Sequence, residues 1–168
     1  MRINSLDLEN FRNYAGEHVD FDPVCNVIWG ENAQGKTNLL EAICCLSCGK
    51  SPRTRGDREL ILFDTEGFRI TGQITSRDRE FVSRIEAFRG KRRKITVNGV
   101  PAKTSAALGQ VLSTVFFAPE DLQIIRSGAA ERRKFMDMSL CQLRPKYAEA
   151  LAEYNRLHEH KTRILRDC

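Results

Sequence analysis

The sequence has no apolar run long enough to cross a membrane and no segment that resembles a secretion signal. Residues 1–7 alternate polar and apolar side chains and lack the continuous apolar core that a signal peptide requires. These two absences exclude membrane-spanning proteins and argue against export. We therefore expect a cytoplasmic protein with no membrane partner.

The cysteines lack the pairing that a metal centre or a disulfide framework needs. The pair Cys45-x-x-Cys48 has no second pair and no nearby His-x-x-His, and only three histidines occur in the chain. Without an export signal, disulfides are not expected either. The sequence therefore favours buried, weakly polar thiols over a zinc site. The six cysteines are Cys25, Cys44, Cys45, Cys48, Cys141 and Cys168.

The remaining composition is that of a soluble domain with a core. The 168 residues are 41% hydrophobic and 29% charged, which allows one domain, with or without an appendage. The net charge of +5 favours an anionic partner, although ATP alone would account for it.

One segment carries a specific chemical prediction. Residues 30–37 read G-x-x-x-x-G-K-T and lie between an apolar run, residues 24–29, and a helical pattern, residues 38–46. This is the arrangement of a phosphate-binding P-loop, in which glycines let the backbone curl around phosphate oxygens at a helix N-terminus. Lys36 would reach the β- and γ-phosphates of ATP, and Thr37 would supply a hydroxyl to Mg²⁺. The predicted nucleotide-binding residues are Gly30, Glu31, Asn32, Ala33, Gln34, Gly35, Lys36 and Thr37.

The pattern of apolar residues predicts an α/β fold with a mixed sheet. Antiparallel strands are favoured after the P-loop helix, and the dipeptide Asn98-Gly99 predicts a tight turn. Short helices are expected at residues 104–112 and 119–125, and Ser127 could cap a further helix that carries residues 131–137. The expected strands are residues 3–10, 18–21, 24–29, 68–75, 80–88, 94–97 and 115–117.

The pattern changes to one long helix from Pro145 onward. Apolar positions then recur at alternating steps of three and four, which fits either the start of a coiled coil or an amphipathic helix on the surface of the domain. We expect an ATPase lobe at residues 1–143, followed at residues 144–168 by the start of a coiled-coil or second-lobe helix that is truncated. The seam comprises Tyr147, Ala150, Tyr154, Leu157, Lys161, Ile164 and Cys168.

A hydrolytic P-loop protein also needs an acidic residue at the end of an apolar strand to hold Mg²⁺. Asp64 follows the run at residues 60–63, but charged residues precede that run. Glu120 and Asp121 follow the run at residues 115–118, but Pro119 intervenes. We therefore expect the acidic residue that holds Mg²⁺ to lie outside this chain. The sequence does not identify catalytic residues within the chain.

Four motifs in the same order resemble the bacterial RecF family of SMC-like, ABC-type ATPases. They are the P-loop followed by Asn38-Leu39, and residues 11–14, 117–122 and 132–137. The resemblance extends from residue 1 to about residue 154 and covers only the N-terminal half of such a protein. The Walker B acids, the ABC signature and the returning coiled-coil strand belong to the other half.

The resemblance implies an ATP-binding, DNA-binding recombination mediator in DNA replication, DNA repair and the SOS response to DNA damage. It implies an ATP-dependent homodimer that closes as a clamp on single-stranded or gapped duplex DNA and acts with other recombination mediator proteins. ATPase activity would be weak and confined to the full-length dimer. Arg12 matches an arginine that approaches the nucleotide in related ATPases, or it is a solvent-facing cation at a strand end. Arg132 and Arg133 either touch DNA phosphate or, as we slightly favour, pair with Glu131 and Asp137.

The sequence indicates the DNA-contacting surface only through clusters of basic residues. Residues 89–94 contain five cations in six positions, which suits either a phosphate-contacting loop or a solvated hairpin tip. A second loop of the same kind runs from Lys50 to Arg58 and includes Arg53 and Arg55. Neither loop has interleaved aromatic residues, so contact would be to the backbone rather than to bases.

Two other classes of function remain open. The chain could be a complete small P-loop kinase or NTPase with Asp64 as its metal acid, or an interaction module with a vestigial P-loop. The antiparallel strands after the P-loop argue against a kinase, which places its next parallel strand after a crossover helix.

Overall fold

The computed structural model describes residues 1–54, 56–102, 104–119, 121, 124 and 128–166. Contacts divide the chain into two compact units, Met1–Phe116 and Phe117–Cys168. The predictions made for Arg55, Glu120, Ser127 and Cys168, and for most of the helix at residues 119–125, lie outside the described residues. The expected division between residues 1–143 and 144–168 stays a prediction.

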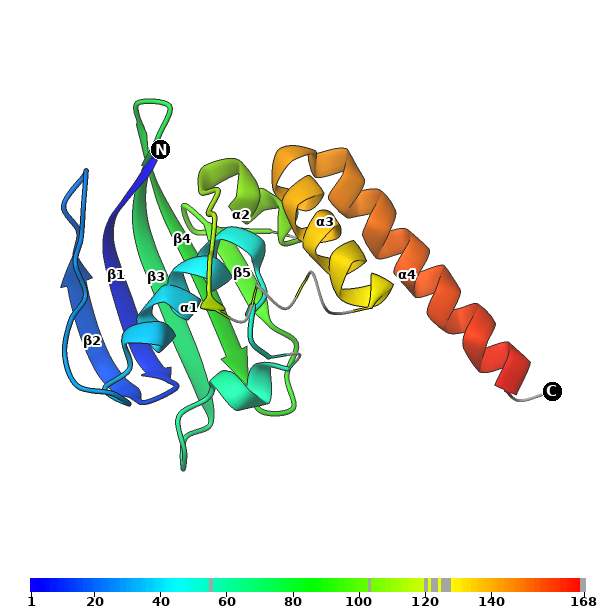
Figure 1. The fold of residues 1–168 in the computed structure, drawn as a ribbon, viewed down its shortest axis with the longest axis horizontal. Helices are drawn as coiled ribbons and strands as arrows, with labels where there is room; N and C mark the ends of the chain where they lie inside the picture. Colours follow the sequence, from blue (N-terminus) through cyan, green and yellow to red (C-terminus); the bar gives the residue numbers. More distant parts are fainter. Residues whose placement is uncertain (55, 103, 120, 122–123, 125–127, 167–168) are drawn as a thin grey trace. The chain divides into compact units, whose positions relative to one another are not determined.

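The first unit is built on a six-stranded sheet with the order β2-β1-β3-β4-β5-β6 (Figure 1). All the pairings between these strands are antiparallel. The turn at Asn98 and Gly99, which have φ of 50° and 76°, joins β5 to β6 as the sequence predicts, because a tight hairpin needs two left-handed residues. The strands are β1 Arg2–Phe11, β2 Tyr14–Asp20, β3 Gly67–Ser76, β4 Arg79–Phe88, β5 Lys94–Val97 and β6 Val100–Pro101.

Alternation along the strands places apolar side chains on one face of the sheet. Leu8, Ile70 and Ile85 lie opposite one another on β1, β3 and β4, and each is at most 1% exposed. The other face carries charges in the same register, where Arg69 pairs with Glu9 and Glu86 at 2.7 Å each. One face therefore forms the core, and on the opposite face Arg69 lies between two acids.

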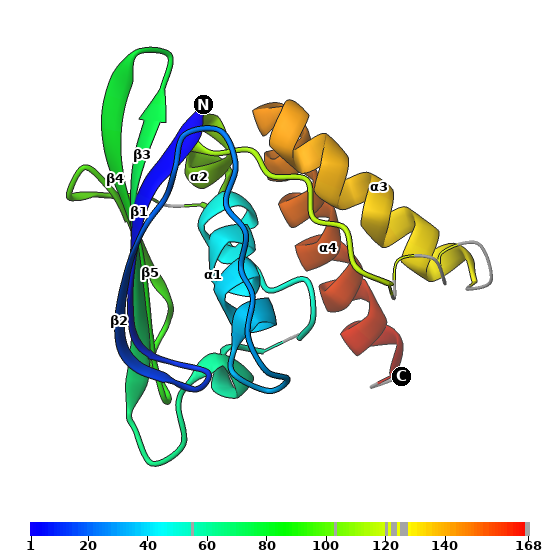
Figure 2. The same cartoon turned by 60° about the vertical axis from the view of Figure 1, so that its left-hand side comes forward.

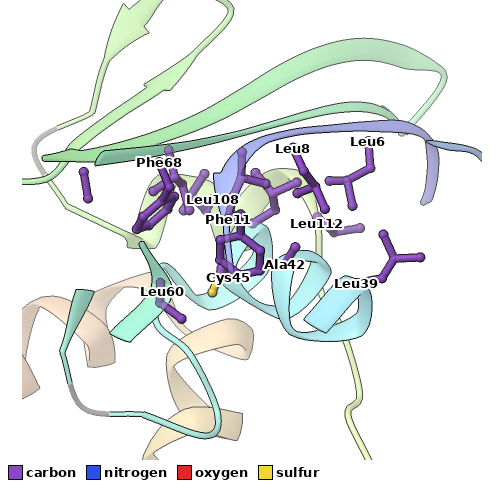
Figure 3. Close-up of a cluster of buried hydrophobic side chains, with 14 of the residues drawn as sticks. Leu6, Leu8, Phe11, Leu39, Ala42, Cys45, Leu60, Phe68, Leu108 and Leu112 are labelled. Carbon is purple, nitrogen blue, oxygen red and sulfur yellow. The ribbon is translucent and has the colours of Figure 1, made fainter. Parts of the chain in front are cut away.

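Helices α1, Lys36–Cys48, and α2, Ala106–Val111, cover the apolar face (Figure 2). Leu46 of α1 packs so closely on β3 that a Cβ added to Gly72 would lie 2.5 Å from its Cδ1. Figure 3 shows the core that results, in which side chains of β1, β3, α1, α2 and the 3₁₀ turn Asp57–Leu60 meet. The core fixes the position of α1, and therefore of the loop that precedes it.

The α/β class is confirmed, but the described sheet is antiparallel rather than mixed. The strands expected at residues 24–29 and 115–117 are not formed, since no described strand pairs with either segment. Most of their side chains are open to solvent, with Val24 90% and Val115 100% exposed. The stretch before Asp64 is likewise not a strand of the sheet, because residues 57–60 form the 3₁₀ turn and Ile61 makes one isolated bridge to Phe11.

The second unit contains two helices, α3 Ala129–Leu143 and α4 Pro145–Arg166. The hydroxyl of Tyr147 on α4 donates to Asp137 on α3 at 2.5 Å. The long helix from Pro145 is confirmed, whereas its coiled-coil pairing stays a prediction. In the described part of the chain, no helix combines the length and the apolarity that a membrane crossing demands.

Candidate nucleotide-binding site

The loop at residues 30–37 has the backbone geometry of an anion cradle. Gly30, Ala33 and Gly35 have positive φ angles of 145°, 68° and 103°, which curl the chain just before α1 begins at Lys36. Of the other predicted loop residues, Glu31, Asn32, Gln34 and Thr37 are exposed and Lys36 is half-buried. The structure thus brings all the predicted P-loop residues together in one accessible turn.

The N-terminus of α1 is electrostatically suited to an anion. Its N-cap residue, Gly35, supplies no side-chain hydrogen bond, and its first turn contains no acidic residue. A helix start carries partial positive charge on N–H groups that lack intrahelical partners. With no acid in the first turn, that charge remains available to a ligand.

Lys36 lies back across its own loop. Its Nζ donates to the carbonyl oxygens of Gly30 at 2.8 Å and Glu31 at 2.5 Å. The ammonium is therefore held against the start of its own loop. Its contact with the β- and γ-phosphates of a nucleotide stays a prediction.

The turn between β1 and β2 supports the loop from outside. The Asn13 amide donates to the carbonyl of Gln34 at 3.3 Å and accepts from Asn38 at 2.8 Å. A Cβ added to Gly35 would lie 2.7 Å from Asn13 Nδ2 and 2.9 Å from the Tyr14 hydroxyl. Gly35 is thus favoured by its left-handed φ, and a larger residue there would also displace the side chains of Asn13 and Tyr14.

Arg12 is fixed beside the loop by a buried carboxylate. It leaves β1 with φ of 56°, and its backbone N–H donates to Leu60 at 2.8 Å. Its guanidinium forms a two-pronged contact with Glu41 of α1, with Nε to Oε2 at 2.9 Å and Nη2 to Oε1 at 2.8 Å, and Nη1 donates to the Glu59 carbonyl at 2.7 Å. Arg12 is 18% exposed. It is therefore an oriented side chain rather than a solvent-facing cation.

Glu41 collects further partners from the loop that follows α1. The Ser51 hydroxyl donates to its Oε1 at 2.5 Å, and Arg53 Nη1 lies 3.3 Å from its Oε2. Arg53 Nη1 also donates to Asn38 Oδ1 at 2.9 Å. Burial alone would raise the pKa of Glu41, but hydrogen bonds from Arg12 and Ser51 and the charges of Arg12 and Arg53 outweigh it and lower that pKa. The carboxylate is therefore ionised and holds two arginines.

Glu41 was not predicted as a site residue, and Arg53 was predicted only as part of a loop that could contact DNA. A signal was present, because Glu41 is the one charged residue in the otherwise apolar stretch 39–46 and follows Thr37 by four positions. Residues at i and i+4 share a helix face, so a carboxylate one turn past the P-loop points along the same side of α1.

The predicted acids do not complete a metal site within the described residues. Asp64 is exposed, with φ of 59°, and lines a surface groove of about 650 Å³ with Phe63 and Arg89. Asp121 accepts from the backbone N–H of Ala118 at 2.7 Å, as a turn-forming carboxylate does. No cluster of three or more His, Cys, Asp or Glu suited to a metal occurs where the structure is described.

Several cations of residues 89–94 are tied to neighbouring groups. Arg93 pairs with Asp57 through two contacts, one of them Nε to Oδ2 at 3.0 Å, and is 20% exposed. Arg89 Nε donates to the Thr65 carbonyl at 3.0 Å, and Lys94 lies 3.9 Å from Glu86. Lys91 lies over the Phe88 ring at 5.7 Å and is exposed, as is Arg92. Fewer than five cations of this loop are therefore available to bind an anion.

The expected pairing on α3 is also different. Glu131 lies 3.9 Å from Lys134, and Asp137 accepts from Tyr147, so neither acid is held by Arg132 or Arg133 in the contacts described. Both arginines are exposed. Their contact with DNA phosphate stays a prediction.

The cysteines of α1 behave as core residues, as predicted. Cys44 and Cys45 are 5% and 2% exposed, and burial raises the pKa of each thiol to about 12. Cys48 is half-buried and its pKa is also raised by burial. Such thiols are poor nucleophiles and poor metal ligands at neutral pH.

Comparisons with known proteins agree with this geometry. Residues 5–165 match a family model described as AAA domain. The DNA replication and repair protein RecF of Lachnoclostridium phytofermentans is 39% identical over 166 residues, which are 99% of this chain and 46% of that protein. The chain thus spans about half the length of the curated relatives it matches.

Solved structures give the same result. The recombination mediator protein RecF of the RecFOR pathway, described as RecF-ATP, superposes with a TM-score of 0.92 at 34% identity, over 98% of this chain and 44% of that chain. A structure from the SMC ATPases has a TM-score of 0.64 at 21% identity, over 81% of this chain and 98% of that chain, which is a likeness of fold. The predicted resemblance and the SMC-type ATPase fold are therefore confirmed.

Proposed function

The chain belongs to the AAA domain family and matches about half of a RecF protein, and on this basis we propose that it is the ATP-binding lobe of a recombination mediator. Its role would be in DNA repair, replication and recombination. The observation that carries the proposal is the loop at residues 30–37, with its positive φ angles, its uncapped helix start and the Lys36 ammonium bonded to the Gly30 carbonyl.

ATP would be held by the residues that the loop brings together. Backbone N–H groups at the start of α1 would bind phosphate oxygens, Lys36 would neutralise the β- and γ-phosphates, and Arg12 would approach from the β1–β2 turn. The exposed hydroxyl of Thr37 fits a Mg²⁺ ligand. Because the described residues contain no cluster of acids around it, Mg²⁺ would depend on the nucleotide's own phosphates and on acids supplied from elsewhere.

The activity would be an ATP-gated change of association. Two copies would join in an ATP-dependent homodimer that closes on DNA and cooperates with other recombination mediators. Support comes from the similarity to RecF of the RecFOR pathway and from the SMC-type fold. Cations on the surface of such a dimer would bind the DNA backbone with little base readout.

ATP turnover should be at background for this chain alone. We expect hydrolysis only when the part of the relatives that this chain does not cover is supplied, because the described residues offer no cluster of acids to hold Mg²⁺. Phosphate release from Mg-ATP, followed with and without that complementary segment, measures this. Robust hydrolysis or phosphoryl transfer by the chain alone, lost in Asp64→Asn, would instead establish the complete kinase or NTPase.

DNA contact at residues 89–94 should depend on Lys91 and Arg92. Changing both to Ala should reduce the slope of log affinity against log salt by roughly two units, since each phosphate contact contributes about 0.9. Changing both to Glu should weaken binding to unrelated duplexes by similar factors. Fluorescence anisotropy across a salt series measures both effects.

Arg93→Ala is the matched control for this experiment. It removes one positive charge from the same loop, but Arg93 is tied to Asp57, so its loss should lower stability and leave the salt slope of binding nearly unchanged. If the Lys91 and Arg92 variants bind as the wild type does at every salt concentration, the loop is a solvated hairpin tip. The DNA surface would then lie elsewhere, with Arg53 and Arg55 the next residues to change.

A further inference from the structure

The two edge strands of the six-stranded sheet, β2 and β6, differ in how well they are protected. β6 has two residues and ends in Pro101, which has no backbone N–H to offer a neighbouring strand. β2 has seven residues, Tyr14–Asp20, and contains no proline, lysine or arginine. Shortness and these residue types commonly protect edge strands, whose unpaired backbone groups otherwise pair with another chain. β2 is therefore the open edge of the sheet (Figure 1).

The backbone groups of β2 alternate between those that pair with β1 and those that face outward. The N–H of Phe21 donates to the Asn4 carbonyl at 2.8 Å, and the same register continues along β2. Hydrogen-bonded pairs alternate with non-bonded pairs along an antiparallel ladder, so every second residue of β2 points its N–H and C=O away from β1. In the described part of the chain, no other segment bonds to these backbone groups. The outward-facing residues are Gly16, His18 and Asp20.

The open edge is preformed and accessible. Side chains on the outer face of the sheet hold β2 in place, because His18 Nδ1 lies 2.6 Å from Asp7 of β1 and His18 Nε2 lies 3.3 Å from Asp20. A Cβ added to Gly16 would meet no atom within 4 Å, so the space over that residue is open. A strand that is already ordered costs less entropy to pair with an incoming segment than a loop that must be ordered first.

The charge around this edge is opposite to that of the whole chain. Residues 13–35 contain four acids and no lysine or arginine, although the chain has a net charge of +5. Glu17 and Asp20 of β2 are both exposed. Such an edge repels DNA phosphate. It also disfavours a second copy of itself, because two β2 strands side by side would bring the acids of both copies together with no lysine or arginine to offset them.

We propose that β2 is a docking edge for an extended, basic segment of a partner protein, which pairs with the sheet as an additional strand. Backbone hydrogen bonds to the three outward-facing residues hold this segment, and its lysine or arginine side chains lie beside Glu17 and Asp20. β2 begins at Tyr14, whose hydroxyl lies close to Gly35, so one end of the docked segment lies near the loop at residues 30–37. Docking requires no bound nucleotide.

Amide hydrogen exchange of this chain, followed by NMR, tests the pairing. The probe is a peptide of about ten residues that alternates Lys and Val, and its control has the same lysines with Pro in place of Val, which cannot pair as a strand. At saturation the Lys–Val peptide should slow exchange at the three outward-facing amides at least about tenfold and leave Glu17 and Val19, which already pair with β1, nearly unchanged. Unchanged exchange at the outward-facing amides, or equal slowing by the Pro peptide, would overturn the proposal.

A charge reversal tests the chemistry of the partner. The double variant Glu17→Lys, Asp20→Lys should bind the Lys–Val peptide about tenfold more weakly, because attractive cross-strand pairs become repulsive. Glu66→Lys with Glu80→Lys makes the same change of net charge at exposed positions away from β2, and should alter affinity less than about twofold. Equal losses in the two double variants would overturn the assignment to this edge.

The same exchange experiment identifies any other occupant of β2. Slowed exchange that grows with protein concentration, without peptide, would show that a second copy of the chain covers the edge. Slowed exchange on addition of the part of the relatives that this chain does not cover would show that this part covers it. Either result would overturn the proposal of a separate basic partner.

Discussion

The Lys36→Ala variant should bind Mg-ATP at least about tenfold more weakly than the wild type, a loss of about 1.4 kcal/mol. The Lys36 ammonium is held against this loop by contacts to the carbonyls of Gly30 and Glu31. Its removal takes away the charge that opposes the β- and γ-phosphates and leaves the backbone cradle in place. Titration calorimetry measures the loss.

A matched lysine separates the effect at this site from a change in overall charge. Lys91→Ala removes the same charge from an exposed hairpin over Phe88, and it should leave ATP affinity unchanged. The fold should survive Lys36→Ala, because the bonds that are lost are made at the surface of the loop. Equal ATP affinities for Lys36→Ala, Lys91→Ala and the wild type would show that the loop at residues 30–37 is not the ATP-binding site.

The sequence predicted those helices, strands and turns that depend on residues a few positions apart. Four strands, the turn at Asn98 and the P-loop with its helix were predicted because alternation, turn residues and glycine spacing act within a few positions. The segments at residues 24–29 and 115–117 have strand-like composition but no described neighbour. A strand needs a partner for its backbone groups, and composition cannot supply one.

The contacts that complete the candidate site come from far along the chain. Arg12 and Glu41 are separated by 29 positions, and Arg93 and Asp57 by 36. The family resemblance implied that Arg12 approaches the nucleotide, with a solvent-facing cation as the alternative, but the sequence offered no reason for its orientation. It also counted Arg93 among the free cations of its loop. The orientation of Arg12 and the pairing of Arg93 both depend on which acid the fold places beside each arginine. The packing of α1 on the sheet decides this, and it involves residues far apart in the sequence.

The Glu41→Ala variant should lower the free energy of unfolding by about 3 kcal/mol, the size of effect seen when a buried ion pair loses one partner. Glu41 is 0% exposed and accepts from Arg12, Ser51 and Arg53, so its removal leaves donors of three residues without their acceptor. Urea unfolding followed by circular dichroism measures the change. Glu80→Ala, at an exposed position of β4, is the control and should change stability by less than about 0.5 kcal/mol. Equal stability of the two variants would show that the Glu41 cluster does not stabilise the fold.

The contribution of Glu41 to the stability of the fold should disappear at acid pH, because its pKa is lowered in the folded protein. Burial would raise the pKa of Glu41, but the Arg12 and Ser51 hydrogen bonds and the two arginine charges lower it below its ordinary value of 4.5. A carboxyl with a lowered pKa binds fewer protons in the folded protein than in the unfolded chain, so its stabilisation is complete above the ordinary pKa and is lost as pH falls through the folded pKa. The difference in unfolding free energy between the wild type and Glu41→Gln should therefore be constant near neutral pH and shrink below about pH 4.5. A difference that stays constant from about pH 7 to about pH 3 would mean that the charge of Glu41 does not stabilise the arginine cluster.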